Sequence, residues 1–202
     1  MDEYARFARL YDPVVGPPLR SLHRAMVREM QRRGLGSVID LCCGTGLFLG
    51  MAASAGLDAS GVDLSPGMLA VARDKYPAAH LLEGDASATP HPSRNFDAAT
   101  ISFGLHEKPD LTARAIFREA LRLTRPGGVV LVADYRRPES GALLTGWSIR
   151  LVERLAGRDH FACFKAYMAG GGSEGFLASE GVPFELVRTA MSGWAGLFAV
   201  SR

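Results

Sequence analysis

Cysteine is scarce in this chain, which has three among its 202 residues, at positions 42, 43 and 163. Two of them are adjacent and no pair has the C-x-x-C spacing, so the sequence contains no disulfide framework. No group of histidine, cysteine and aspartate residues has the spacing of a metal site, and we expect no bound metal. Reduced thiols are typical of the cytoplasm, where we expect the protein to be located.

Long apolar segments and a strong charge of either sign are also absent. The apolar runs, such as residues 129–133, fall far short of the roughly 20 residues that a transmembrane helix requires. The first residues, MDEYARFARLYDP, lack the apolar core of a secretory signal. The formal net charge of +2 gives no basis for nucleic-acid binding. We therefore expect neither a membrane span nor a nucleic-acid partner.

The chain has the composition of a soluble globular domain, with 48% hydrophobic and 22% charged residues. Strand-like and helix-like hydrophobic periods alternate along it, which is typical of a parallel α/β sheet. The last two β segments are joined by a short connection, which only an antiparallel pair allows. The strands are predicted at residues 37–41, 59–63, 80–83, 96–102, 129–133, 184–189 and 196–201.

A glycine loop follows the first predicted strand, in the sequence VIDLCCGTG at residues 38–46. Glycines at such a position allow the backbone to approach a ligand, and the next helix offers free N–H groups. The loop alone also fits a simple tight turn or a nicotinamide-dependent dehydrogenase. The dehydrogenase pattern requires a third glycine three residues after Gly46, where this chain has Leu49.

Three acids lie at or beside the carboxyl ends of successive predicted strands, at Asp40, Asp63 and Asp85. A carboxylate at Asp63 is placed to accept both hydroxyls of a ribose. Taken singly, Asp63 equally fits an acid whose charge suits the start of the next helix. Ligands of open α/β sheets bind at the carboxyl ends of the strands, so the three acids together indicate one binding site.

The successive motifs of this chain resemble those of class I S-adenosylmethionine (SAM)-dependent methyltransferases. The segments that carry the resemblance are VIDLCCGTG, GVDLSPGML, EGDA, FDAATISFGLHEKPD and LRLTRPGGVVLVADY, over about residues 38–135. The second and fourth segments resemble the small-molecule branch that includes ubiquinone and menaquinone C-methyltransferases. The resemblance implies a Rossmann-like, seven-stranded, mostly parallel sheet with an antiparallel C-terminal hairpin strand and helices on both faces.

The resemblance also implies a role for individual residues. Methyl transfer from SAM to a small-molecule acceptor would leave S-adenosylhomocysteine as the product. The side chain of Asp40 and the backbone of the glycine loop would hold the methionine part of SAM, Asp63 the ribose, and the residues that follow it the adenine. The implied cofactor-binding residues are Asp40, Cys42, Gly44, Gly46, Asp63, Leu64, Met68, Asp85, Ala86, Ser102 and Phe103.

The resemblance further divides the single domain, residues 1–202, into four parts. A lead-in and helix at 1–36 precede the SAM-binding core at 37–135. Substrate-side helices are expected at 136–182, before the closing β-hairpin at 183–202. We expect Asp12-Pro13 and Gly16-Pro17-Pro18 to interrupt the lead-in, so that its helix starts near Leu19.

His106 is the candidate general base or substrate contact, because a neutral histidine near pH 7 suits proton transfer. It equally fits a histidine that packs and hydrogen-bonds locally. Tyr11 resembles an aromatic residue that closes over the cofactor, and is the second catalytic candidate. Quinone methyltransferases carry an arginine and then an asparagine where this chain has His106 and Glu107, which puts a quinone acceptor in doubt.

Two other functions remain open from the sequence. A non-catalytic SAM-binding or interaction protein would use the same binding residues, and only product formation separates it from an enzyme. A nicotinamide-dependent oxidoreductase would require a third loop glycine or a catalytic Tyr-x-x-x-Lys, and we find neither. The acceptor, its reacting atom and the oligomeric state are not indicated by any motif.

Overall fold

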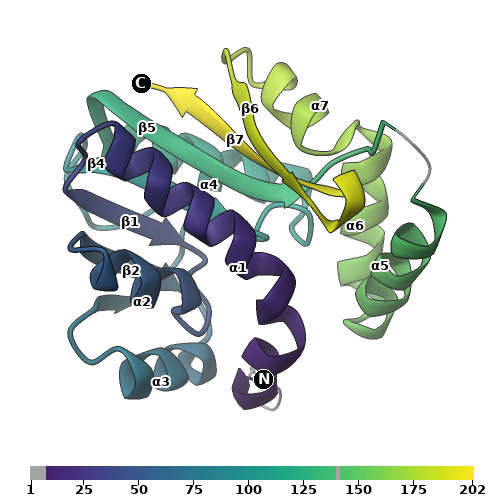
Figure 1. Ribbon diagram of the computed structural model, residues 1–202, viewed down its shortest axis with the longest axis horizontal. Helices are drawn as coiled ribbons and strands as arrows, with labels where there is room; N and C mark the ends of the chain where they lie inside the picture. The colour runs from purple at the N-terminus through teal and green to yellow at the C-terminus, as the bar shows by residue number, and fades with distance from the viewer. Residues whose placement is uncertain (1–7, 140–141) are drawn as a thin grey trace.

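The computed structural model describes residues 8–139 and 142–202, apart from the side chains of residues 8–15, 17 and 18. Over these ranges the chain forms a seven-stranded sheet with helices on both faces (Figure 1). The strands are β1 (Ser37–Leu41), β2 (Asp58–Asp63), β3 (His80–Glu83), β4 (Phe96–Ser102), β5 (Thr124–Tyr135), β6 (Glu185–Ala190) and β7 (Ala195–Ser201). The α-helices are α1 (Ala8–Arg32), α2 (Leu47–Ser54), α3 (Pro66–Lys75), α4 (Asp110–Leu123), α5 (Leu143–Leu155), α6 (Arg158–Ala169) and α7 (Gly172–Ser179).

The strand order in the sheet is β3-β2-β1-β4-β5-β7-β6. The first five strands pair in parallel, whereas β7 is antiparallel to both β5 and β6. This arrangement confirms the predicted parallel core and the closing hairpin. From β1, the chain builds the sheet first toward β3 and then, from β4, in the other direction. The neighbouring strands β1 and β4 therefore mark the switch point, where the direction of strand order reverses. Open α/β sheets bind ligands at the carboxyl ends of the strands at this point.

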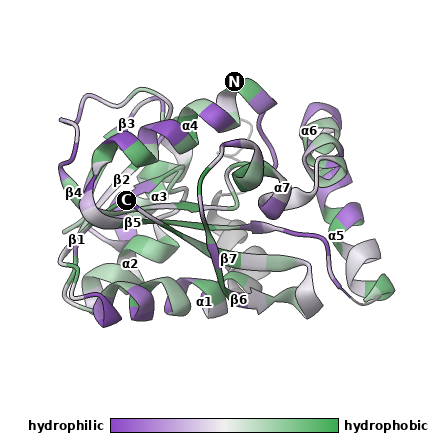
Figure 2. Cartoon of the chain, turned by 90° about the horizontal axis from the view of Figure 1, so that it is seen from above, coloured by the Kyte–Doolittle hydropathy of each residue, from purple (hydrophilic) through white to green (hydrophobic). Residues whose placement is uncertain are grey.

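Alternate residues of each strand face opposite helix layers, as the pleat of a strand requires. In β5, Leu131 packs in the core beneath α1 and α2, whereas Val130 and Val132 pack against α4 and α7. Figure 2 shows α1 and α2 along one face of the sheet and α4 along the other, with largely apolar strands between them. Because β5 is covered on both faces, its sequence reads as a continuous apolar run.

Two predicted boundaries are wrong. The first helix begins at Ala8 and continues past the prolines that we expected to interrupt it. Proline removes one helical hydrogen bond, but its fixed φ is close to the helical value, so it disfavours a helix without excluding one. The fifth strand is longer than residues 129–133, because Thr124 already pairs with Phe96 and an irregularity in register then precedes the regular ladder.

The segment between the fifth and sixth strands is helical, as predicted. Its first two helices, α5 and α6, lie beyond one end of the sheet, whereas α7 packs against one face of β5 (Figure 1). A small core of Tyr135, Ile149 and Phe164 joins α5 and α6 to the end of β5. The outer side of α5 is apolar and exposed, with Leu143, Leu144, Trp147, Leu151, Val152 and Leu155 more than half accessible. No helix in the described ranges is long and apolar enough to cross a membrane.

Candidate active site

A cavity lies at the carboxyl ends of β1 to β4. Its volume of about 550 Å³ is within the range of small-molecule binding sites. Its walls come from the loops after these four strands and from α1 and α4. All the residues that the resemblance assigns to the cofactor, except Gly46, line this cavity: Asp40, Cys42, Gly44, Asp63, Leu64, Met68, Asp85, Ala86, Ser102 and Phe103.

The glycine loop turns sharply because three of its residues have left-handed backbone conformations. The φ angles are 65° at Cys42, 54° at Gly44 and 73° at Gly46. Glycine adopts this region freely, whereas at Cys42 it costs about 1–2 kcal/mol. A Cβ at Gly46 would come within 3.2 Å of the Tyr76 ring and the Ala72 methyl group. Gly46 therefore shapes the loop and its contact with α3, rather than lining the cavity.

Asp63 at the end of β2 is held in place by the backbone on both sides. Its Oδ2 accepts a hydrogen bond from the N–H of Gly44 at 2.7 Å, and its Oδ1 accepts one from the N–H of Ser65 at 2.9 Å. Burial raises the pKa of Asp63, while these two donors oppose the rise. A carboxylate has about four acceptor positions, so both oxygens can still accept bonds from a ligand.

Asp40 is almost fully buried at the floor of the cavity. It accepts a hydrogen bond from the Thr100 hydroxyl of the neighbouring strand at 2.6 Å. Burial raises the pKa of Asp40 to about 7, and the nearby Asp63 carboxylate adds to the rise. A positively charged ligand group beside Asp40 would favour its ionised form.

The loops after β2 and β3 form the opposite end of the cavity. Met68 is buried in its wall, whereas Leu64 is 74% exposed beside the opening. Asp85 accepts a hydrogen bond from the N–H of Ser87 at 2.8 Å, which lowers the pKa of Asp85. Ala86 next to it is buried in the same wall. This end thus combines apolar surface with one ionised acceptor, as the edge and face of an adenine require.

Ser102 and Phe103 form the wall after β4, as predicted. The Ser102 hydroxyl lies 2.7 Å from Nε2 of His23, a residue of α1 that the sequence analysis did not single out. His23 is 3% exposed and lines the cavity. The sequence signal that could have identified His23 is its position next to Leu22, on the buried side of an amphipathic helix. Phe103 has a φ of 53°, a strained conformation of the kind found at functional sites.

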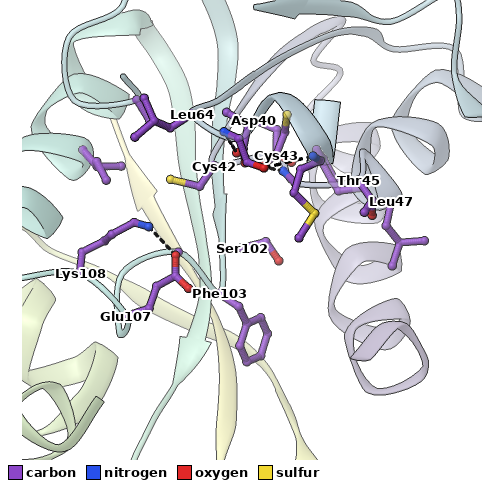
Figure 3. Close-up of a pocket in the computed structure, with 18 of the residues that line it drawn as sticks. Asp40, Cys42, Cys43, Thr45, Leu47, Leu64, Ser102, Phe103, Glu107 and Lys108 are labelled. Atoms are coloured by element: carbon purple, nitrogen blue, oxygen red, sulfur yellow. Dashed lines mark hydrogen bonds and ion pairs between the residues drawn. The ribbon is translucent and has the colours of Figure 1, made fainter. Parts of the chain in front are cut away.

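The wall of the cavity also contains an ion pair that the sequence analysis did not identify. Nζ of Lys108 lies 2.5 Å from Oε1 of Glu107, and both residues line the cavity. Burial opposes protonation of Lys108, but the Glu107 carboxylate raises its pKa. Figure 3 shows this pair facing the loop of Asp40, Cys43 and Thr45 across the cavity.

The charges around the cavity favour a cationic ligand. Among the side chains that the structure describes, its lining includes one ammonium group, that of Lys108, and several carboxylates. The carboxylates belong to Asp40, Asp63, Asp85 and Glu107. Like charges in a partly buried space repel one another, and a positively charged ligand relieves that repulsion.

His106 does not line the cavity, so the structure does not place it as the predicted base. It is 4% exposed, and its Nδ1 lies 2.7 Å from Oδ1 of Asp134. Although burial opposes protonation, the carboxylates of Asp134 and Glu153 raise the pKa of His106 to about 10. A charged, paired imidazole is a poor proton acceptor near pH 7. The other catalytic candidate, Tyr11, has its side chain outside the described part of the chain.

Beyond His106 lies a group of side chains that the spacing argument did not anticipate. The ligand-type atoms of His106, Glu153 and His160 all lie within 4.8 Å of one another. We refer to these three residues as the histidine–carboxylate cluster. Sequence spacing could not reveal this group, because α5, α6 and the loop after β4 bring distant positions together. Hydrogen bonds from His106 and His160 hold the pKa of Glu153 well below its ordinary value, against the effect of burial.

Residues 38–128 match the family described as a methyltransferase domain. Over 118 residues, the chain is 38% identical to the demethylmenaquinone methyltransferase of Renibacterium salmoninarum. This alignment covers 58% of the chain and 49% of that protein. The chain spans about half the length of the first curated relatives that it matches.

Solved structures show the same architecture. A putative SAM-dependent methyltransferase of Methanococcus maripaludis superposes with a TM-score of 0.67 at 14% identity. The superposition covers 98% of this chain and 93% of that chain. The SAM-bound amino pentose methyltransferase of Micromonospora echinaspora gives a TM-score of 0.54 at 26% identity, over 60% of this chain and 52% of that chain. The sheet order and these likenesses together confirm the fold expected from the sequence.

Proposed function

We propose that this chain, whose residues 38–128 match the methyltransferase-domain family and which has the class I fold, transfers a methyl group from SAM to a small-molecule acceptor. The observation that carries the proposal is the convergence of Asp40, Asp63 and Asp85 on one cavity at the switch point of the sheet. These acids lie at or beside the carboxyl ends of three adjacent strands, and they surround a space that favours a cation. SAM carries both a sulfonium and an ammonium group.

Different residues of the cavity are suited to bind the ribose, methionine and adenine parts of SAM. The Asp63 carboxylate, held by the N–H groups of Gly44 and Ser65, is oriented to accept both ribose hydroxyls. Asp40, Asp85 and Met68 line the same cavity, where Asp40 would favour the positive methionine part and the other two would flank the adenine. These assignments deepen the proposal, and each is tested by substitution of a single residue.

The chemistry then requires mainly positioning by the protein. SAM, when bound, supplies a methyl group that the positive sulfur already activates for an in-line displacement. Phe103 and Ser102 would hold the acceptor side of the cavity in place, so that the two reactants meet at near-attack distance. Glu107 and Lys108 offer a hydrogen-bond acceptor and a donor at the same wall, and we assign them to acceptor binding.

The acceptor is proposed to be a small molecule with a polar group close to the reacting atom. The curated relative named above is a demethylmenaquinone methyltransferase, which makes a reduced naphthoquinone the first compound to offer. Glu107 lines the cavity. By the resemblance, quinone methyltransferases carry an uncharged asparagine at this position. Phenols and amino sugars therefore belong in the same acceptor panel.

The proposal is tested in two steps with the purified protein. Calorimetric titration with SAM and with S-adenosylhomocysteine should show binding with micromolar dissociation constants. Titration with NADH, the control ligand, should show no binding. Incubation with methyl-labelled SAM and each acceptor class should then give a labelled product. Absence of SAM binding would overturn the proposal. Tight SAM binding with no product from any class would favour the non-catalytic alternative.

A further inference from the structure

The histidine–carboxylate cluster joins α5 and α6, whose place beside the sheet Figure 1 shows, to the loop after β4. Glu153 comes from α5, His160 from α6, and His106 from the loop after β4. The rings of Phe103 and His106 are 6.1 Å apart, so the cluster adjoins the cavity without opening directly into it. The methyl-transfer chemistry proposed above does not use these three side chains.

We propose that the histidine–carboxylate cluster is a binding site for a single zinc ion. Zinc prefers imidazole nitrogen and carboxylate oxygen ligands at about 2.0–2.2 Å, which places tetrahedral ligand atoms about 3.3–3.5 Å apart. Nε2 of His106 lies 3.4 Å from Oε2 of Glu153, which already matches this spacing. Nε2 of His160 lies 2.5 Å from the same oxygen, and this hydrogen bond would open by about 1 Å around the ion.

In each of these side chains, the nitrogen or oxygen that would not bind the metal has a partner of its own. This is the usual arrangement around a protein-bound metal. Nδ1 of His106 lies 2.7 Å from Oδ1 of Asp134, and the hydroxyl of Tyr135 donates to Oε1 of Glu153 at 2.8 Å. On the far side of the other imidazole, Nδ1 of His160 lies 3.5 Å from Oε2 of Glu107. The inner atoms, Nε2 of both imidazoles and Oε2 of Glu153, lie together, with both nitrogens within 3.4 Å of that oxygen.

Asp134 is itself fixed, so it can orient the imidazole that it contacts. It is fully buried, and its Oδ2 accepts a hydrogen bond from the N–H of Leu105 at 3.0 Å. Its Oδ1 accepts a second one from the N–H of Tyr135 at 2.7 Å. A carboxylate–histidine pair of this kind selects the tautomer whose Nε2 is free to bind a metal.

The charges of the region also fit a divalent cation. Asp134, Glu153 and Glu107 contribute three carboxylates, and Lys108 contributes one ammonium group beside Glu107. With the two imidazoles neutral, these side chains carry a net charge of −2, which zinc would balance. Paired charges and metal coordination are the usual ways in which proteins accommodate buried carboxylates.

Two histidines and one carboxylate also bind iron(II), but zinc tolerates a four-coordinate site with one position left to water. Such an ion would join α5 and α6 to the loop after β4 through three strong bonds. These helices already contact the sheet through the small core of Tyr135, Ile149 and Phe164 and through the hydrogen bond from Tyr135 to Glu153. The expected consequence is a more stable fold, independent of SAM and of any acceptor.

The test uses the full chain without an affinity tag, freed of metal with a chelator. Titration with Zn²⁺ should give one ion per chain and, at about 100-fold excess over its dissociation constant, a rise in Tm of about 5–10 °C. Titration with Co²⁺ should give the visible absorption bands of a tetrahedral site. His160→Ala and Glu153→Gln should each weaken Zn²⁺ binding by more than tenfold and remove the Co²⁺ bands.

Two control variants locate the ion. His80→Ala removes a histidine that is exposed on β3, and Cys163→Ser removes a thiol on the same helix as His160. Both should leave Zn²⁺ affinity unchanged. Since His160 is partly exposed, His160→Gln offers a milder change if the alanine variant does not fold. No binding by the wild-type chain, binding retained in both His160 variants, or binding lost in Cys163→Ser would each overturn the proposal.

Discussion

Asp63 accepts a hydrogen bond of 2.7 Å from the backbone N–H of Gly44, so the acid at the end of β2 fixes the glycine loop after β1. The two features that the sequence offered separately are therefore one structural unit. The carboxylate assigned to the ribose is oriented before any ligand arrives, which lowers the entropic cost of binding.

Replacing Asp63 tests the ribose assignment. Asp63→Ala removes an acceptor of two charge-assisted hydrogen bonds, each contributing about 1.5–3 kcal/mol, so SAM affinity should fall at least about 100-fold. Asp58→Ala, on the same strand but 71% exposed, should leave the affinity unchanged. Calorimetry measures both. Equal SAM affinity of Asp63→Ala and wild type would exclude Asp63 from the binding site.

Asp40 should make the unliganded protein lose stability as pH rises. Its folded-state pKa is about 7, above the ordinary 3.8, so between these pH values the folded protein holds a proton that the unfolded chain has released. This contribution is complete below about pH 4 and declines up to about pH 7. Urea denaturation at pH 5, 6 and 7.5 should show a decline in wild type that Asp40→Asn lacks. Parallel pH profiles of the two proteins would contradict the raised pKa.

His106 should prove to be structural before it proves to be catalytic. In metal-free protein, His106→Ala leaves Asp134 and Glu153 buried without their central partner, which should destabilise the fold by about 3–5 kcal/mol. His80→Ala, which removes a largely exposed histidine, should change stability by less than about 0.5 kcal/mol. The measurement is urea denaturation with EDTA present. Unchanged stability with reduced methyl transfer would instead restore His106 as a base.

Gly50 should be intolerant of a side chain. A Cβ there would lie 2.1 Å from the ring of Tyr76, so Gly50→Ala should destabilise the fold by about 1–3 kcal/mol. Gly36→Ala meets nothing closer than 3.7 Å and serves as the control. Combining Gly50→Ala with Tyr76→Leu should restore part of the loss in thermal unfolding. Strictly additive effects of the two changes would show that they do not interact.

Much of the scaffold was predictable from sequence, because local signals and the fold agreed. The segment SVIDL at residues 37–41 is a strand with the predicted bounds. Ser65 caps α3 by accepting a hydrogen bond from the N–H of Met68, and Pro66 occupies the first helical position. Period, capping and glycine turns depend on neighbours in the chain, so one sequence suffices to recognise them.

The side chains that complete the sites were not predictable in this way. His23 meets Ser102 across 79 positions of the chain, and Glu107 acquires its role only because the loop after β4 forms a wall of the cavity. Sequence patterns among neighbouring residues do not predict contacts between positions that are far apart in the chain.

By itself, the sequence determined the order of strands and helices and the three acids at the strand ends, since chain order and parallel pairing place those ends at one edge of the sheet. Only the tertiary structure decided what His106 contacts. Asp134, Glu153 and His160 reach it from three other elements, and packing of α5 and α6 against the sheet brings them within hydrogen-bonding or metal-ligand distance. Burial then turns a histidine that looked like a free base into part of an ionic cluster.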